Sequence, residues 1–403
     1  MKGNGCADAD GFSMPPEWAP HSGCFVSWPC KEDTWCGFSK EAKKAYAEVI
    51  EAVNKFEPAV VLSDPSTLTE ARGAVDESVH VIEIELDDAW IRDNGPTFVT
   101  SDEGDSAIVQ FGFNGWGGRF PPYDSDAKVP EVLADRMGLR RYLAPIVLEG
   151  GAVCVDGEGT LMTTESCLLN ANRNPGLSRT DIEQILRSYL GVRKILWLKQ
   201  GIHNSMIDGH IDGVAAFVRP STVVMASTDD EQDPNCQVMR ANRTRLETMT
   251  DAKGRSIEIV DLPMPKRREI AGNRIAPCYT NFFIARGGVV APTFGEANDR
   301  AAIAILQDLF PKHEVVGVRC EYIGVGGGEI HCITQQIPKA SDGALAQLLQ
   351  ASVYDSLAER HSKGSAPRKR PSRRKGEATE IRRVSRRGFG PWLCVQSDFT
   401  AGL

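Results

Sequence analysis

One cysteine is a clear candidate nucleophile: Cys332, which closes the stretch Gly326 to Cys332 (GGGEIHC). A thiol is partly ionised near neutral pH, and its thiolate is strongly nucleophilic. Consecutive glycines permit positive φ angles and close approach of the backbone to a ligand, so Gly327 and Gly328 are candidate substrate-binding positions. The structural alternative is that Cys332 is a small buried hydrophobe and that the glycines form a plain flexible loop.

Three carboxylates and a histidine in Gly-rich segments could act with that thiol. They lie in Trp90 to Asp93 (WIRD), Leu148 to Gly151 (LEGG) and Asp208 to Asp212 (DGHID). A guanidinium ion is planar and pairs bidentately with carboxylates, so Asp93 and Asp212 could fix its plane against the thiol. Trp90 and Trp116 could wall the pocket and contact a cation through their faces, although a place in the aromatic core explains them as well. The set indicates covalent chemistry on a small cationic carbon centre such as a guanidinium.

His210 is the predicted general acid and base, because a free imidazole titrates near ~6.5 and can hold or release a proton at working pH. If residues 208–212 are extended, His210 and Asp212 point to the same side and share a pocket. The same pair with Glu149 could instead bind a metal, but no second histidine or thiol has convincing ligand spacing, and we expect no metal. The other six histidines are expected to be structural.

The elements that must position these residues alternate between helix and strand. Apolar residues at helical spacing predict helices over 41–56, 178–190 and 298–310, the second with a capping-box start at Ser178 and Asp181 and a stop at Gly191. Short apolar or alternating runs predict strands over 58–62, 79–86, 192–198 and 314–318. The chain is therefore expected to be an α/β protein. No strong internal repeat indicates how its elements close on one another.

Composition is that of an ordinary globular protein, with 41% hydrophobic and 25% charged residues. No apolar run reaches the ~18 residues that a membrane helix needs, the start lacks a signal-peptide pattern, and the eleven cysteines are scattered. We therefore expect free thiols, no membrane contact and a cytoplasmic location. Charge is divided: residues 339–403 carry 13 Lys+Arg against 6 Asp+Glu, and the remainder carries 33 against 48. An acidic body favours small cations and repels nucleic acid.

Several longer motifs resemble the agmatine deiminase (agmatine iminohydrolase) family, within the peptidylarginine-deiminase-like group of guanidine-modifying enzymes. Besides the segments quoted above, the resemblance rests on residues 14–21 (MPPEWAPH), 113–118 (FNGWGG), 163–170 (TTESCLLN), 172–177 (NRNPGL) and 331–338 (HCITQQIP). The motifs stand in the family's order and cover roughly residues 14–338. This implies a polar N-terminal extension (1–13), a deiminase catalytic domain (14–338) and a basic, mostly disordered tail (339–403).

The resemblance implies a five-bladed, pseudo-symmetric α/β propeller of the pentein type, with the active site in its central channel. It implies hydrolytic deimination of a small guanidine; for agmatine the products are ammonia and N-carbamoylputrescine, an intermediate in putrescine and polyamine biosynthesis. Cys332 would attack the guanidinium carbon and form a covalent S-alkylthiouronium. His210 would protonate the leaving nitrogen and then activate water, and Glu149 would orient His210 or meet the remaining nitrogens. No metal or organic cofactor is needed.

The chain departs from the family pattern four positions before His210, where a carboxylate is expected and Met206 stands. That carboxylate is a candidate partner of the free amine of agmatine, and a thioether cannot pair with an ammonium. Asp208, or an acid from another loop, could substitute. Otherwise the substrate is another small guanidine, with amidino transfer to an amine as a variant. A binding protein without turnover is a third interpretation, disfavoured by the intact Cys332 and His210.

The tail leaves some partners open. Its stretch 368–375 (RKRPSRRK) could contact nucleic acid or act as a targeting patch, whereas disorder from low apolar content is the plainer explanation. A short helix is expected over 343–358, at the start of the tail. The expected ligand of the body is a small cationic guanidine. No pattern decides whether the protein forms a homo-oligomer.

Overall fold

The structure is a computed structural model that describes residues 5–351 apart from 204, 267 and 271. The chain divides into two units, Met1–Leu357 and Ala358–Leu403, and all described residues belong to the first. Residues 352–403, with the basic stretch and the end of the helix expected over 343–358, lie outside the described residues. Within the described part of the chain, no helix combines the length and the apolar character needed to cross a bilayer.

Five sheets built on one plan organise the described residues. In each, an antiparallel pair of strands is extended by a parallel strand, and parallel neighbours require a crossover, usually a helix. The α/β class predicted from the sequence is therefore confirmed. In strand order the sheets are β19 (Thr334–Pro338), β2 (His21–Ser27), β3 (Ala59–Ser63), β4 (His80–Glu83); β1 (Phe12–Ser13), β5 (Thr97–Ser101), β6 (Ser106–Gly112), β7 (Arg140–Val147); β10 (Lys194–Leu198), β9 (Thr160–Thr164), β8 (Cys154–Val155); β11 (Ala215–Arg219), β12 (Thr222–Ser227), β13 (Glu258–Pro263); and β16 (Phe283–Ala285), β17 (Gly288–Thr293), β18 (Glu314–Arg319).

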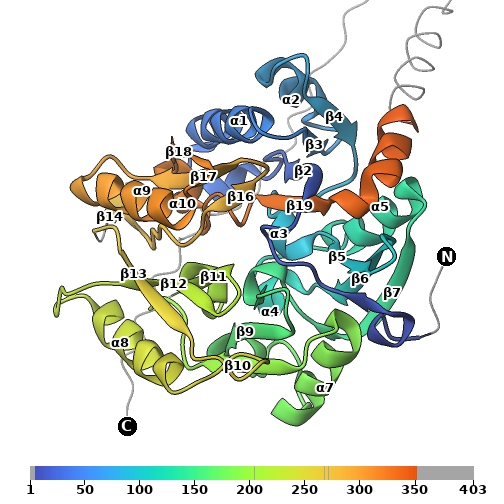
Figure 1. The fold of residues 1–403 in the computed structure, drawn as a ribbon. Coiled ribbons are helices and arrows are strands. Elements are labelled where there is room, and N and C mark those ends of the chain that lie inside the picture. Colours follow the sequence, from blue (N-terminus) through green and yellow to red (C-terminus); the bar gives the residue numbers. More distant parts are fainter. Residues whose placement is uncertain (1–4, 204, 267, 271, 352–403) are drawn as a thin grey trace, which may run out of the picture. The chain divides into compact units, whose positions relative to one another are not determined.

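Each sheet has one long crossover helix, and the sheet of β2 also has the short helix α2 (Leu68–Ala74) between β3 and β4. Figure 1 shows the five long helices toward the periphery, outside their sheets. They are α1 (Ser39–Asn54), α5 (Val129–Met137), α7 (Arg179–Leu190), α8 (Pro234–Glu247) and α9 (Ala297–Leu309). An amphipathic helix buries its apolar stripe; in α1 the buried positions include Ala45, Val49 and Val53. The predicted capping box of α7 is present at Ser178 and Asp181.

The predicted elements agree with the structure to within two residues, with one exception. The strand expected over 79–86 is shorter, because β4 ends at Glu83. Ile84 N still donates to Ser63 O of β3 (3.0 Å), but the next backbone N–H groups bond to side chains: Leu86 N donates to Asp64 Oδ2 (3.3 Å), and Asp87 N donates to Asp126 Oδ1 (2.9 Å). The chain therefore leaves the sheet before it reaches Trp90.

The remaining elements are short. They are the hairpin β14 (Arg268–Ile270) and β15 (Asn273–Ile275), the helices α2 (Leu68–Ala74), α3 (Ile91–Asn94), α4 (Gly115–Gly118), α6 (Glu165–Leu168) and α10 (Glu321–Val325), and the 3₁₀ turns η1 (Asp8–Asp10), η2 (Glu32–Trp35), η3 (Asp126–Lys128), η4 (Gly150–Ala152), η5 (Ile211–Gly213) and η6 (Lys339–Ser341). Of these, η4 packs against both α3 and η5, and α3 also packs against β19. Short connecting elements of different sheets thus meet.

Packing continues past residues 14 and 338, the expected limits of the catalytic domain. On the N-terminal side Ala7 is buried and β1 pairs with β5. On the C-terminal side residues 342–351 are helical. There Leu345 and Leu348 are buried in one cluster with Leu133 of α5 and Ile337 of β19. The first described part of the tail is therefore integral to the packed unit.

Candidate active site

The side chains expected to do chemistry meet where the connections between successive sheets come together. Each of the five sheet-to-sheet connections contributes at least one residue. These are Asp93 after β4, Glu149 and Gly151 after β7, His210 and Asp212 after β10, Asn281 before β16, and the stretch from Gly327 to Cys332 before β19. Segments remote in sequence therefore build one site.

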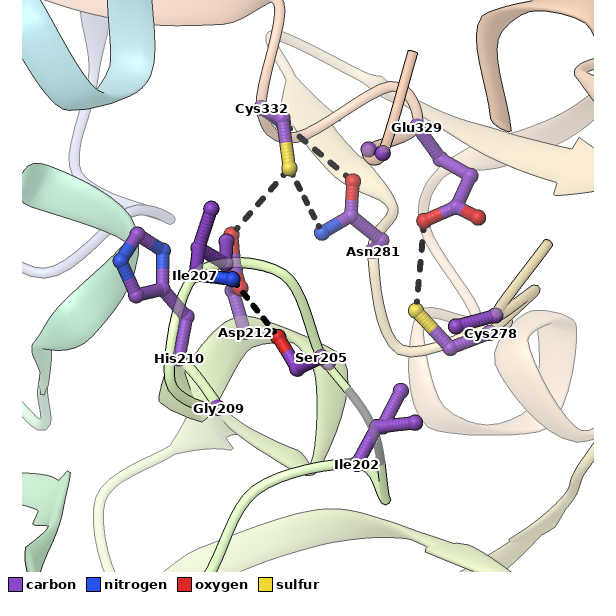
Figure 2. Close-up of a pocket in the computed structure, with 14 residues that line it drawn as sticks. Ile202, Ser205, Ile207, Gly209, His210, Asp212, Cys278, Asn281, Glu329 and Cys332 are labelled. Atoms are coloured by element: carbon purple, nitrogen blue, oxygen red, sulfur yellow. Dashed lines mark hydrogen bonds between the residues drawn. The ribbon is translucent and has the colours of Figure 1, made fainter. Parts of the chain in front are cut away.

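Cys332 lies in a buried pocket with its thiol between two polar groups (Figure 2). Its Sγ accepts a hydrogen bond from Asn281 Nδ2 (3.3 Å) and lies 3.6 Å from Asp212 Oδ2. Asn281 also fixes the backbone, since Cys332 N donates to Asn281 Oδ1 (3.2 Å). One amide thus holds both the main chain and the sulfur of the candidate nucleophile.

The surroundings of Cys332 favour the neutral thiol. Burial raises the pKa of Cys332 well above its usual range, and the negative charges of Asp212, Asp93 and Glu329 raise it further. An approaching cation would oppose those charges and thereby favour the thiolate. The pocket as it stands is suited to a positively charged ligand.

Asp93 is held in place by two hydrogen bonds. Its Oδ2 accepts from Trp116 Nε1 (2.9 Å) and its Oδ1 from Gly151 N (3.0 Å). Trp116 adopts φ 54°, a left-handed conformation that is rare for a bulky residue and is often found at functional sites. Asn114 supports this turn by accepting a hydrogen bond from Gly117 N (2.7 Å). Burial, reinforced by neighbouring carboxylates, raises the pKa of Asp93.

His210 sits between two carboxylates without touching either closely. Its Nδ1 lies 3.6 Å from Asp93 Oδ1, and its Nε2 lies 4.0 Å from Glu149 Oε2. Within the described residues, neither ring nitrogen of His210 makes a hydrogen bond, and Glu149 Oε2 has no hydrogen-bond partner. The other oxygen of Glu149 accepts from Arg173 Nε (2.6 Å), and both side chains are fully buried. Glu149 is therefore fixed by Arg173 with one oxygen turned toward His210.

Asp212 belongs to a second series of linked ion pairs (an ionic chain), besides the one that contains Glu149 and Arg173. His331 places Nδ1 3.0 Å from Asp212 Oδ2 and Nε2 2.7 Å from Glu17 Oε1. Two carboxylates can both accept only if both ring nitrogens carry hydrogen, so this ring is the imidazolium. Burial opposes each of the shifts that follow. The pairing nevertheless raises the pKa of His331 and lowers that of Asp212. Together with Arg92, the pairing also holds the pKa of Glu17 at about 2. Asp212 is thereby kept ionised, and Arg92 pairs with a carboxylate (Glu17, 3.4 Å) as a structural residue.

Residues 208–212 are not extended, so the condition under which the sequence places His210 and Asp212 on one side of a strand is not met. Asp208 and Gly209 have φ angles of 65° and 84°, and the following residues form η5. His210 and Asp212 nevertheless both line the pocket. Asp208 does not: its Oδ2 accepts from Arg173 Nη1 (2.7 Å), and its Oδ1 pairs with Arg119. The structure thus places Asp208 in an ionic cluster beside the pocket.

The remaining predicted positions lie around the glycine run. Gly327 and Gly328 line the pocket, and Gly327 has φ 103°, a conformation that favours glycine. A side chain on Gly328 would meet Trp90 Cζ3 at 2.7 Å and Cys332 Sγ at 2.8 Å, so Trp90 backs the glycine run. Met206 is 47% exposed, and its Cε lies against Gly327. Met206 itself is not among the residues that line the pocket.

The residues present do not favour a metal. Glu149, Cys167 and His210 each place one possible ligand atom within 4.8 Å of the other two. This set has Cys167 where the set considered from the sequence has Asp212. Glu149 already pairs with Arg173, and burial, followed by the charge of Glu149, raises the pKa of the Cys167 thiol well above its usual range. A cation bound there would share Glu149 with the guanidinium of Arg173 and would have to ionise a disfavoured thiol.

A sequence model of the Porphyromonas-type peptidyl-arginine deiminase family matches residues 13–338. The chain belongs to this family. Among its relatives, the agmatine deiminase of Ectopseudomonas mendocina (strain ymp) is 44% identical over 360 residues, covering 83% of this chain and 98% of the relative. The agmatine deiminase of Pseudomonas aeruginosa (strain LESB58) is 44% identical over 354 residues, covering 82% and 96%. The solved agmatine deiminase of Enterococcus faecalis matches with a TM-score of 0.81 at 36% identity, over 84% of this chain and 98% of that one. The family resemblance expected from the motifs is confirmed.

Four residues of the site were not predicted from the sequence: Asn281, Arg173, His331 and Glu329. Arg173 and His331 stand inside motifs that carried the family resemblance, and His331 precedes Cys332 directly, so proximity was a usable signal. Asn281 has no such neighbour in the sequence. Glu329 lies within the glycine–cysteine stretch, where a charged residue ahead of a buried cysteine could have been noticed.

Proposed function

We propose that this protein is a hydrolase of C–N bonds in linear amidines that converts agmatine and water to N-carbamoylputrescine and ammonia. The observation that carries the proposal is the meeting of Cys332, His210, Asp93 and Asp212 in one buried site. The choice of agmatine is supported by relatives named agmatine deiminase, which are 44% identical over most of this chain. The reaction belongs to the route toward putrescine and the polyamines.

Two carboxylates would hold the guanidinium. Asp212 is kept ionised by His331, and the arriving cation would lower the raised pKa of Asp93, because an opposite charge nearby favours the charged form. Bidentate pairing would align the planar guanidinium with its carbon facing the sulfur of Cys332. The Asn281 amide, which donates to that sulfur at 3.3 Å, would steady the thiolate.

The first half of the reaction removes ammonia. The bound cation offsets the carboxylate charges that raise the pKa of Cys332, so the thiol gives its proton to His210 and attacks the guanidinium carbon. His210 then returns that proton to the leaving nitrogen. Ammonia departs, and an S-alkylthiouronium remains on Cys332.

The second half consumes water. His210 takes a proton from water as its oxygen adds to the thiouronium carbon, and the carbon–sulfur bond then breaks to expel the Cys332 thiolate. The hydroxyl proton passes to solvent, the His210 proton returns to the sulfur, and the ureido product is released. Glu149, held by Arg173 with one oxygen 4.0 Å from His210 Nε2, would stabilise the protonated ring in both halves. Every step uses side chains of this chain, and none requires an added cofactor.

We also propose that the five sheets form the blades of a pseudo-symmetric propeller with the site in its central channel. Support comes from the repeated plan of the sheets and from the contribution of each sheet-to-sheet connection to the site. A reducing, cytoplasmic setting is proposed on the free thiols of the buried cysteines, which are Cys24, Cys154, Cys167, Cys236, Cys278, Cys320 and Cys332.

Ammonia release from agmatine, measured with the wild-type protein and with Cys332→Ala side by side, tests the proposed function. We expect release of ammonia and of N-carbamoylputrescine that depends on Cys332, with agmatine still bound by the variant. Equal release by the variant would overturn the covalent mechanism. An absence of release from agmatine, with release from another small guanidine, would overturn the substrate. Product carrying the amidino group on an added acceptor amine would instead identify a transferase.

A further inference from the structure

Two carboxyl groups line the pocket, those of Asp212 and Glu329, and that of Glu329 has no part in the reaction described above. Glu329 is 3% exposed and lines the same pocket as Cys332. Its Oε2 lies 3.4 Å from Cys278 Sγ, a weak hydrogen-bond donor. Burial raises the pKa of Glu329 to about 8; the hydrogen bond from Cys278 opposes this shift and the charge of Asp212 adds to it.

Glu329 differs from the other acids of the site in its partners. Asp212 has the imidazolium of His331, and Glu149 has Arg173. For Glu329, no ion pair with a cationic side chain occurs within the described residues. A buried carboxylate without a counter-charge is strongly unfavourable, so this position is suited to a cation that arrives with a ligand.

The pocket also offers room for a chain between two charges. Glu329 and Cys278 lie across the drawn pocket from His210 (Figure 2). Ile202, Ile207 and Ala276 contribute apolar wall to the same pocket, which is partly open to solvent. Apolar walls with a few placed polar groups are typical of sites for small ligands. A short methylene chain would suit these walls.

We propose that Glu329 determines substrate specificity by pairing with the ammonium at the far end of an amino-guanidine. The inference rests on the proposed function, because it takes the guanidinium end to be held at Cys332. Asp208, the substitute considered from the sequence, is already engaged by Arg119 and Arg173 and does not line the pocket. Glu329 is the pocket carboxyl left for a second positive charge.

Two substrates and two variants test this pairing. Agmatine and butylguanidine share the guanidinium and a four-carbon chain, but only agmatine carries the amine. Glu329→Gln keeps the shape and removes the charge. Glu321→Gln is the control, because Glu321 of α10 pairs with Arg319 outside the pocket.

We expect Glu329→Gln to raise KM for agmatine on the order of 10- to 100-fold, the range of a hydrogen bond to a charged group. KM for butylguanidine and kcat for both substrates should change less than about threefold, and Glu321→Gln should behave as wild type. An equal loss of kcat with both substrates would assign Glu329 to proton transfer or to folding, and unchanged KM values would remove its role; either result overturns the pairing. If wild type releases ammonia from neither substrate, the proposed function fails instead.

A second measurement covers the case in which Glu329→Gln does not fold. The titratable groups around Glu329 are Cys278, Cys320, Asp212 and Cys332. Using Cys332→Ala removes the reactive thiol, and the raised pKa values of Cys278 and Cys320 keep those thiols neutral at neutral pH. Calorimetry in two buffers with different ionisation enthalpies then counts released protons. Agmatine should release more protons than butylguanidine, because the ammonium ionises Glu329; equal counts would overturn the pairing.

Discussion

Gly151 occupies a point of the site where even a methyl group cannot fit. An added Cβ would lie 2.7 Å from His210 Nδ1 and 2.8 Å from both Asp212 Oδ2 and Asp93 Oδ1, whereas ordinary contact begins at 3.4 Å. Its φ angle is not in the left-handed region, so Gly151→Ala introduces no backbone strain. The substitution should act purely by pushing three reacting groups apart.

The required displacement is about 0.7 Å for His210 and about 0.6 Å for each carboxylate, taken from the difference between those distances. Misplacement of reacting groups by about 1 Å reduces rates on the order of 100-fold, so we expect kcat/KM for ammonia release to fall about 10- to 100-fold. Overpacking lowers the free energy of unfolding by about 1–3 kcal/mol. Gly151 N donates to Asp93 Oδ1 (3.0 Å), so the carboxylate cannot move without straining that bond.

The matched control is Gly73→Ala. Gly73 lies in α2, and a Cβ added there would meet no heavy atom within 4 Å, so activity should stay unchanged and the free energy of unfolding should rise by about 0.4–1 kcal/mol. Both variants are compared by steady-state kinetics and by urea unfolding. Wild-type kcat/KM in Gly151→Ala would refute the reasoning, because the three groups would then not need their observed spacing.

Two further predictions concern the ionic chains behind the site. Arg173→Met leaves buried Glu149 without its cation, so the free energy of unfolding in urea should fall by about 3–5 kcal/mol; a loss below about 1 kcal/mol would contradict the buried pairing. Glu17 has its pKa lowered from 4.5 to about 2, so its contribution to stability is present above pH 4.5 and is lost as pH falls toward 2. His331 has a raised pKa, so its contribution is full below its usual 6.5 and is lost as pH rises through the raised value. Urea unfolding across pH should show both losses, and His331→Asn should flatten both; an unaltered pH profile would count against the ionic chain.

Local sequence patterns predicted the elements well because their determinants are local. The capping box of α7 and the apolar stripe of α1 each depend on residues within a few positions of one another. The conformation of residues 208–212 has a local cause too: an Asp-Gly pair favours a turn, and Asp208 and Gly209 are both left-handed. The extended conformation considered for this segment is therefore not adopted.

The candidate site was predicted only in part, for a different reason. The nucleophile and acids stand in recognisable motifs, and the structure brings Cys332, His210 and Asp212 into one pocket. Asn281 and Glu329 gain their significance from contacts across the fold, with Cys332 and Cys278 respectively. No spacing within the chain encodes which sheet connections meet. These partners therefore had to come from the structure.

The covalent intermediate on Cys332 is the most direct test of the account. Agmatine turnover is stopped with acid within the first turnovers, and the protein is digested and weighed by mass spectrometry. The covalent mechanism predicts an added mass equal to agmatine less ammonia on the peptide that contains Cys332, and no such mass in Cys332→Ala. Steady release of ammonia with no adduct on that peptide at any quench time, or an adduct on another residue, would contradict it.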